Sequence, residues 1–208
     1  MKSLLLSSLF VIVAATAYGA GPDYMKGKYD IDPAHTRVSF VVPHFVVSEV
    51  EGRFNDVAGE FNLNETFKKS TFTATVQTKS IDTGVSKRDD HLRTKDFFEV
   101  EKYPTMKMVS KSITGDEKAF RVVVAVTIKD VTKNIPFDGK YTGSAKDPWG
   151  GQRAALQLTG KLNRKDFHIN YDDKISIGDA VGNEITVTIR TEGVLAGDKA
   201  AEKAPEKK

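Results

Sequence analysis

The chain has 208 residues, of which 39% are hydrophobic, and a formal net charge of +3 at pH 7. This length suits a single all-β barrel or sandwich with a substantial core. The weak, scattered charge gives no reason to expect nucleic acid or an anionic membrane as a partner. The chain contains no cysteine, which excludes disulfides, thiol catalysis and an anchor on a lipidated cysteine.

Residues 1–19 have the features of a cleaved export signal. Lys2 supplies the positive charge, Leu4 to Ala15 form a short apolar run, and small residues place the cleavage near residues 17–20. An uncleaved anchor helix is the alternative, but the apolar run is shorter than the ~20 residues that span a bilayer. We therefore expect a secreted protein, located in the periplasm of a two-membrane bacterium.

From residue 28 to residue 194, apolar and polar residues alternate with the period of two that is typical of strands with one buried face. The alternating segments lie around residues 38–42, 61–63, 72–76, 106–108, 120–128, 135–141, 154–162 and 185–189. Turn-forming residues separate several of these segments. The pattern predicts one all-β domain, a single antiparallel β-barrel of about eight strands, with a two-sheet sandwich as the alternative.

The period of two breaks near residues 87–95, where one short helix is predicted. Ser86 and Asp89 form an S-x-x-D helix start, in which Ser86 would cap the helix. Asp89 and Arg93 would lie one turn apart and could form an ion pair. We expect this helix to be a plug or lid near one mouth of the barrel.

Residues 197–208 are predicted to form a disordered charged tail. The segment GDKAAEKAPEKK contains no large apolar residue, so it cannot bury enough surface to offset the entropy cost of ordering.

The polar sequence Arg88-Asp89-Asp90-His91 is the most concentrated group of candidate functional side chains. His91 could act as a general base oriented by an aspartate. However, adjacent residues on a helix point in different directions, so the four cannot converge on one substrate atom. Contact with a ligand headgroup is the better functional interpretation, and a capped helix with internally paired charges is the structural one.

The remaining chemistry-bearing patterns are weak. Among His35, His44, His91 and His168, the closest pair is nine residues apart, so no metal site is expected. Motifs for nucleophilic catalysis or nucleotide binding are also missing from the sequence, and no cofactor is predicted.

The inward-facing apolar residues are the candidate ligand-binding surface. They either fill a dry core or line a cavity, since a closed sheet of about eight strands can do both. Small residues and flexible methionines at inward positions favour a cavity. Even so, the residues alone do not decide between a dry core and a cavity. The candidates are Phe40, Phe61, Phe72, Val76, Met106, Met108, Val122, Val124, Val126, Phe137, Leu156, Leu158 and Val187.

Motifs along nearly the whole domain resemble those of the YceI family of secreted lipid-binding barrels. Two positions depart from the family pattern, because Asp130 and His168 stand where glycine is common. The matching motifs, in order, are YDIDPAHT (29–36), GRF (52–54), SIDT (80–83), RDDHL (88–92), DFF (96–98), YP (103–104), VTIKDVTK (126–133) and NRKDF (163–167).

The resemblance implies an extended lipocalin-like barrel that encloses a long-chain amphiphile of the polyisoprenoid or isoprenoid-quinone type. It implies a periplasmic carrier and not an enzyme. The polar residues of the family motifs, here His35, Arg88, Asp89 and His91, are expected to bind the headgroup at the barrel mouth or to hold the helix. An enzyme that acts on the headgroup through a His/Asp site at the mouth is the alternative. Transient membrane contact and a homodimer are left open.

Overall fold

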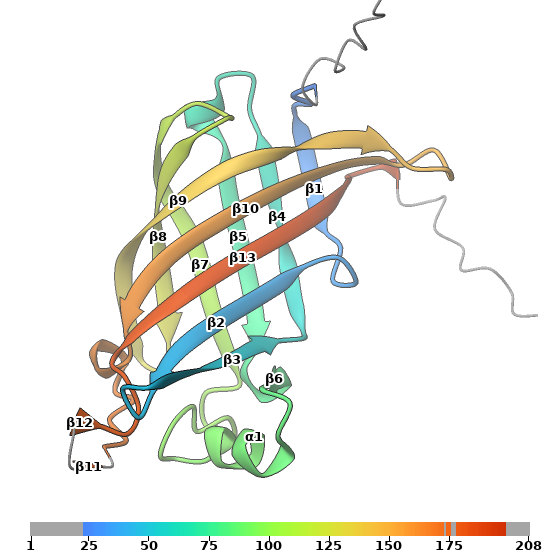
Figure 1. Cartoon of the computed structure of the whole chain (residues 1–208). Helices are drawn as coiled ribbons and strands as arrows, with labels where there is room; N and C mark the ends of the chain where they lie inside the picture. Colours follow the sequence, from blue (N-terminus) through green and yellow to red (C-terminus); the bar gives the residue numbers. More distant parts are fainter. Residues whose placement is uncertain (1–22, 173, 176–177, 199–208) are drawn as a thin grey trace, which may run out of the picture.

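The computed structural model describes residues 23–172, 174–175 and 178–198, and most of them belong to one antiparallel sheet of 11 strands (Figure 1). The sheet closes into a barrel because β1 pairs with both β4 and β13. An all-β, lipocalin-like barrel of eight strands is therefore confirmed. Around the ring, these strands are β1 (Gly27–Ile31), β4 (Val57–Leu63), β5 (Thr71–Gln77), β7 (Thr105–Gly115), β8 (Phe120–Ile128), β9 (Val131–Lys146), β10 (Gln152–Asn163) and β13 (Glu184–Leu195).

A side branch of the sheet widens the barrel at its lower end in Figure 1. One edge of β13 pairs first with β2 (Arg37–His44) and further along with β1, so β1 and β2 follow one another beside the same strand. The branch continues from β2 through β3 (Ser48–Phe54) to β6 (Ile81–Asp82).

Short elements connect the strands. Three 3-10 helices, η1 (Phe67–Lys69), η2 (Thr78–Ser80) and η3 (Arg164–Phe167), follow β4, β5 and β10. Two short strands, β11 (Lys174–Ile175) and β12 (Gly178–Asp179), pair with each other before β13. Within the described residues, no helix has both the length and the apolar character needed to cross a bilayer.

The helix α1 (Ser86–Arg93) lies at the lower end of the barrel, close to its predicted position (Figure 1). Two predicted details are wrong. Val85 is the capping residue and no side chain caps the helix, because Ser86 is already in the first turn. Arg93 bonds to Asp90, at 2.9 Å from Nη1 to Oδ1, since the Asp89 carboxylate is turned back to the loop before the helix.

The sequence prediction included β2 but missed the longer strands β1 and β3, as well as the two-residue strands β6, β11 and β12. In each of the two longer strands a glycine takes a position on the apolar face, Gly27 on the face of Tyr29 in β1 and Gly52 on the face of Phe54 in β3, so the apolar alternation is weak. The predicted export signal lies outside the described residues. So does most of the predicted tail, although Asp198 at its start accepts a 2.9 Å hydrogen bond from the backbone N–H of Gln152.

Candidate functional site

The lower half of the barrel encloses an apolar cavity of about 320 Å³. This volume lies within the range of roughly 300–1,000 Å³ that is typical of small-molecule sites. Strands form its wall, and α1 with the loop that follows it forms part of its cover. The apolar lining consists of Val38, Phe40, Val42, Pro43, Phe45, Val50, Phe54, Val76, Ile81, Leu92, Phe97, Phe98, Met106, Met108, Val126, Ile128, Phe137, Leu162, Ile169, Ala180, Val181, Ile185 and Val187.

The barrel changes from hollow to packed along its axis, and β8 shows the change most clearly. Ile128 and Val126, at the lower end of β8, line the large cavity. Val124, one step higher on the same face, lines a second void of about 50 Å³. Val122 and Phe120 are buried and line neither space. Inward-facing residues therefore have different surroundings according to their depth in the barrel.

The predicted apolar ligand residues divide between these depths. Val122 and Leu156 belong to the packed upper core, where they are at most 2% exposed. Phe61, Phe72, Val124 and Leu158 line the small void. The residues that line the large cavity are Phe40, Val76, Met106, Met108, Val126, Phe137 and Val187.

Val38 and Met108 line both spaces and therefore form the floor between them. Val38 is on β2, and Met108 is on β7, where it pairs with Val126 of β8. A methionine side chain has three rotatable bonds and can adapt its shape. Met108 is thus the residue at the floor that can most easily change the depth of the cavity.

The prediction missed two groups of lining residues. Ile128, Leu162 and Ile185 stand at the ends of the predicted strands 120–128, 154–162 and 185–189, on their apolar faces, but they were not included among the predicted ligand residues. In contrast, Phe97 and Tyr171 come from irregular loops, where no period indicates which side chain points inward.

Arg88 and Asp89 of α1 are both bonded to Thr83, in the loop that precedes the helix. Arg88 lines the cavity and donates from Nε to Thr83 Oγ1 at 2.7 Å and from Nη2 to the Thr83 carbonyl at 2.8 Å. Asp89 is buried and does not line the cavity. Its Oδ1 accepts bonds from the backbone N–H of Thr83 at 2.9 Å and from the Thr83 hydroxyl at 2.6 Å. Asp89 thus holds α1 in place, whereas Arg88 adds a positive charge to the cavity wall.

His91 also lines the cavity, on the side where α1 faces the loop before β11. Its Nε2 lies 3.0 Å from Asp96 Oδ2. The rings of Phe97 and Tyr171 contact the imidazole edge to face, each with a centroid separation of 5.2 Å. The His91 side chain is 43% exposed, so it lies at the rim of the cavity and is accessible from water.

Arg164, which also lines the cavity, has a structural role. It is only 4% exposed, and its guanidinium donates to the carbonyls of Ile169, Val181 and Gly182 at 2.8–3.1 Å. A weaker contact of 3.4 Å reaches Asp172. These bonds fix the chain between β10 and β13, which places Ile169 and Val181 against the cavity.

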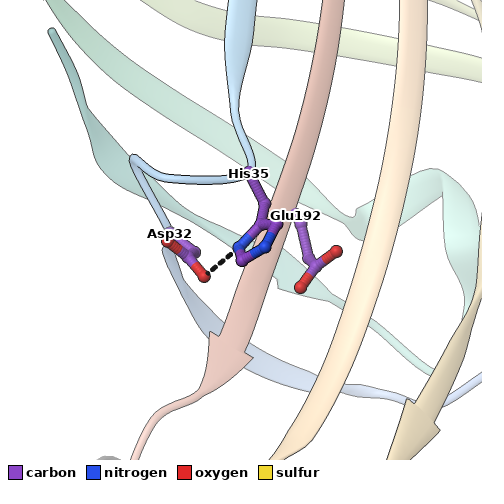
Figure 2. Close-up of side chains that lie close together, drawn as sticks. All are labelled: Asp32, His35 and Glu192. Carbon is purple, nitrogen blue, oxygen red and sulfur yellow. Dashed lines mark hydrogen bonds and ion pairs between the residues drawn. The ribbon is translucent and has the colours of Figure 1, made fainter. Parts of the chain in front are cut away.

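His35 lies away from the cavity, at the corner between β1 and β2 (Figure 2). Its Nδ1 is 2.7 Å from Asp32 Oδ2, and Glu192 of β13 lies beside the pair. Arg153 of β10 donates from Nη1 to Asp32 Oδ2 at 2.7 Å and to Glu192 Oε1 at 2.8 Å. Its Nε donates to Asp147 at 2.9 Å. His35 therefore belongs to an ion-pair cluster and is not next to Arg88 and His91, with which the sequence prediction grouped it.

The pKa values at this corner follow from the same contacts. Burial alone would raise the pKa of Asp32, but hydrogen bonds from His35, Arg153 and the Ala34 N–H outweigh it and hold the pKa below its usual value. Ligand atoms of Asp32, His35 and Glu192 lie within 4.8 Å of one another, close enough for a metal ion. However, the Arg153 guanidinium already supplies positive charge to both carboxylates, and it would repel a second cation.

The two departures from the YceI motifs meet in the structure. His168 ends η3 in the left-handed conformation, with φ of 57°, which explains why glycine is favoured there. Its Nδ1 lies 3.1 Å from Asp130 Oδ1, in the turn between β8 and β9. The two residues therefore join two turns at the lower end of the barrel.

A closed antiparallel barrel with an apolar cavity and a few polar groups at its rim defines a lipocalin-like, ligand-binding class of protein. Residues 29–193 match the YceI-like domain. The chain therefore belongs to the YceI family.

Curated relatives and solved structures agree with this assignment. Protein YceI of Escherichia coli O157:H7 is 34% identical over 196 residues, covering 93% of this chain and 98% of the relative. The fold matches the YCEI protein of Campylobacter jejuni with a TM-score of 0.62 and 23% identity, over 91% of this chain and 98% of that one. It also matches a polyisoprenoid binding domain from Saccharophagus degradans with a TM-score of 0.57 and 12% identity, over 82% and 99% of the two chains.

Proposed function

We propose that this protein is a periplasmic carrier that binds the tail of a long-chain amphiphilic lipid, of the polyisoprenoid or isoprenoid-quinone type, in the lower half of its barrel. The apolar cavity is the observation that carries the proposal. The family assignment and the polyisoprenoid-binding structural neighbour support a binding role and not an enzymatic one. The export signal predicted at residues 1–19 supports the periplasmic location.

The cavity volume limits how much of a tail it holds. At about 30 Å³ for a group the size of a water molecule or a methylene, 320 Å³ takes roughly ten such groups. Each buried methylene contributes about 0.8 kcal/mol, so such a tail segment gives roughly 8 kcal/mol before the cost of immobilisation. A longer tail must extend past the rim or displace Met108 and enter the void of about 50 Å³ above it.

The rim fits a headgroup that accepts hydrogen bonds. The Arg88 guanidinium has five N–H donors, of which Nε and one Nη2 hydrogen are bonded to Thr83. His91 lies at the same rim, in the cavity lining. A phosphate or a quinone carbonyl is the kind of group that these two side chains would bind.

Native mass spectrometry of the protein purified from its own cells, with organic extraction of bound material, tests the proposal. We expect one lipid of several hundred daltons per chain. Stripped protein should take up one molecule of farnesol per chain. Protein that is purified empty and takes up no farnesol would contradict the proposal.

Two tryptophan variants on β7 make this test specific. Met108→Trp fills the floor of the cavity and should lower farnesol uptake at least fivefold. Lys107→Trp adds the same ring to the exposed face of the same strand and should leave uptake unchanged. Equal uptake by both variants would show that the ligand does not occupy this cavity.

The contact between His91 and Asp96 supports a second candidate function, an enzyme that acts on the lipid headgroup. A histidine next to a carboxylate at a cavity rim has the geometry of a general base. Incubation with the extracted lipid separates the candidates. Chemically unchanged lipid indicates a carrier, whereas conversion by the wild type but not by a His91→Gln variant indicates an enzyme.

A further inference from the structure

The turn between β2 and β3 presents consecutive apolar side chains to water. Phe45, Val46 and Val47 are 41%, 65% and 78% exposed. The backbone of the turn is nevertheless firmly held. The Phe45 N–H donates to the Ala180 carbonyl at 3.0 Å, and the Gly182 N–H donates to the Pro43 carbonyl at 2.8 Å. These side chains are therefore displayed on an anchored turn.

The residue types of this turn do not suit its backbone. Phe45 and Val46 have φ values of 50° and 62°, in the left-handed region. Asparagine and glycine are the usual residues of such a hairpin turn, and a β-branched residue is strained there. Neither exposure nor backbone geometry explains an apolar side chain at position 46, so contact with an apolar partner is the remaining physical reason for it.

The turn is continuous with the mouth of the cavity. Pro43, His44 and Phe45 line the cavity, whereas the more exposed Val46 and Val47 do not. The segment from residue 43 to residue 48 contains no lysine, arginine, aspartate or glutamate, and the exposed Glu49 follows it. A surface without cations has no electrostatic attraction to anionic lipid or to an acidic protein, but it can enter an uncharged apolar phase.

We infer that the β2–β3 turn, residues 45–47, docks into the surface of a zwitterionic lipid bilayer and places the cavity mouth against it. This inference rests on the proposed function, because a lipid tail that occupies the cavity must leave and re-enter a bilayer. Docking of the turn lets the tail pass along Phe45 into the cavity without crossing water.

Flotation of the purified protein with phosphatidylcholine vesicles tests the inference. The wild type should bind, with little dependence on salt, because charges do not drive the contact. The double variant Val46→Gly with Val47→Thr should lower the vesicle partition coefficient at least about tenfold, since two apolar side chains are lost. Glycine also removes the strain at position 46, so the variant should unfold at no lower temperature than the wild type.

Trp149 provides a matched control at another site. It is 63% exposed in the turn between β9 and β10, and it is the single tryptophan of the chain. A Trp149→Ser variant should bind vesicles as the wild type does. A reporter with Val47→Trp in a Trp149→Phe background should show a blue shift in fluorescence on vesicle addition, whereas Trp149 in the wild type should show none.

Farnesol uptake from detergent solution, without vesicles, separates this inference from the proposed function. Normal uptake with vesicle binding lost in the double variant supports docking. Wild-type protein that takes up farnesol but ignores vesicles, or a double variant that binds them normally, overturns docking and leaves the carrier proposal intact. Failure to take up farnesol overturns the carrier proposal. A wild-type dimer that the double variant dissociates, with no vesicle binding, would show that the turn contacts a second copy.

Discussion

Asp32 and Arg153 show how single ionic residues stabilise the barrel where the chain turns from β1 into β2. The side chain of Asp32 is 7% exposed and that of Arg153 is 15% exposed, so water screens their contact only weakly. Arg153 also reaches Asp147 and Glu192, and it thereby joins β13 and the turn between β9 and β10 to the corner. Loss of one partner would leave the others buried with an unbalanced charge.

The lowered pKa of Asp32 predicts an acid-sensitive contribution to stability. A carboxyl whose pKa is lower in the folded state contributes stability above its unfolded pKa, and the contribution is lost as pH falls through the folded value. The wild type should therefore lose stability below about pH 4. An Asp32→Asn variant should be about 1–3 kcal/mol less stable at pH 7. Its stability should also fall less steeply with acid.

Urea unfolding at pH 7 and between pH 4 and pH 2 measures both effects. The Asp147 pKa is also lowered, by its hydrogen bond with Arg153, so part of the acid dependence should remain in the variant. Asp138→Asn is the control. It removes an exposed ion pair with Arg121, which water screens, so it should change stability much less than Asp32→Asn does. If the stability of the wild type and of Asp32→Asn fell identically with pH, Asp32 would not be a cause of the loss of stability in acid.

Individual site residues were only partly predictable from the sequence. His35 and His91 belong to the same set of family motifs, yet one lies in an ion-pair corner and the other at the cavity rim. Asp89 and Arg88 are neighbours in the chain, but the helix turns one toward the Thr83 backbone and the other toward the cavity. Spacing along the chain identifies polar residues, but it does not show which group each one faces.

At the scale of elements, α1 is a cover held by a small number of polar contacts. Asp89 and Arg88 bond to Thr83 in the preceding loop, and Arg93 donates to the carbonyls of Lys79 and Ile81. Leu92 and His91 face the cavity. A short helix has little intrinsic stability and depends on such contacts. Local opening of α1 therefore depends on these polar contacts.

An Asp89→Ala variant should loosen α1 without unfolding the barrel. Loss of the two hydrogen bonds from Thr83 should cost about 1–3 kcal/mol locally. Hydrogen exchange of the backbone amides in residues 86–93 should then accelerate about 10–100-fold, while the amides of β8 keep their protection. Asp90→Ala is the control, since Asp90 is exposed and contacts Arg93. Unchanged exchange in α1 would show that other contacts hold the helix.

The strands were predictable to the extent that their two faces differ in polarity. β8, with the sequence FRVVVAVTI, was found because its inward positions are buried and apolar. β3 was missed because Gly52 interrupts its apolar face between Val50 and Phe54, and because its pairing partners are β2 and the short β6. Pairing across the sheet stabilises such a strand, and this contribution is not visible in the strand's own sequence.

At the scale of the whole molecule, the barrel has a packed upper half and a hollow lower half. Tyr29 and Phe61 stack in the upper half with a centroid separation of 5.1 Å, and Leu156 is buried there at 2% exposure. The period of two indicates that a side chain points inward, but it does not indicate its depth. For this reason the sequence alone did not distinguish a dry core from a ligand cavity.

Two leucines of β10 test the division into halves. Leu156→Ala should cost about 2–5 kcal/mol of unfolding free energy, because Leu156 is fully packed, and should leave farnesol uptake unchanged. Leu162→Ala should cost about 1–2 kcal/mol, because its side chain already borders empty space, and should change uptake. Urea unfolding measures the stability of both variants, and farnesol uptake measures their ligand binding. If both variants lost the same stability, or if only Leu156→Ala altered farnesol uptake, the barrel would not have a packed upper half and a hollow lower half.

The pairing of β1 with β13 also constrains when the protein can fold. Tyr29 pairs with Leu195, so the barrel closes through residues from opposite ends of the described chain. Contacts between such distant residues slow folding, since a long loop must be ordered before they form. The barrel therefore cannot close on the ribosome until β13 has been synthesised. This delay keeps the polypeptide unfolded during synthesis, which the export proposed for this protein would require.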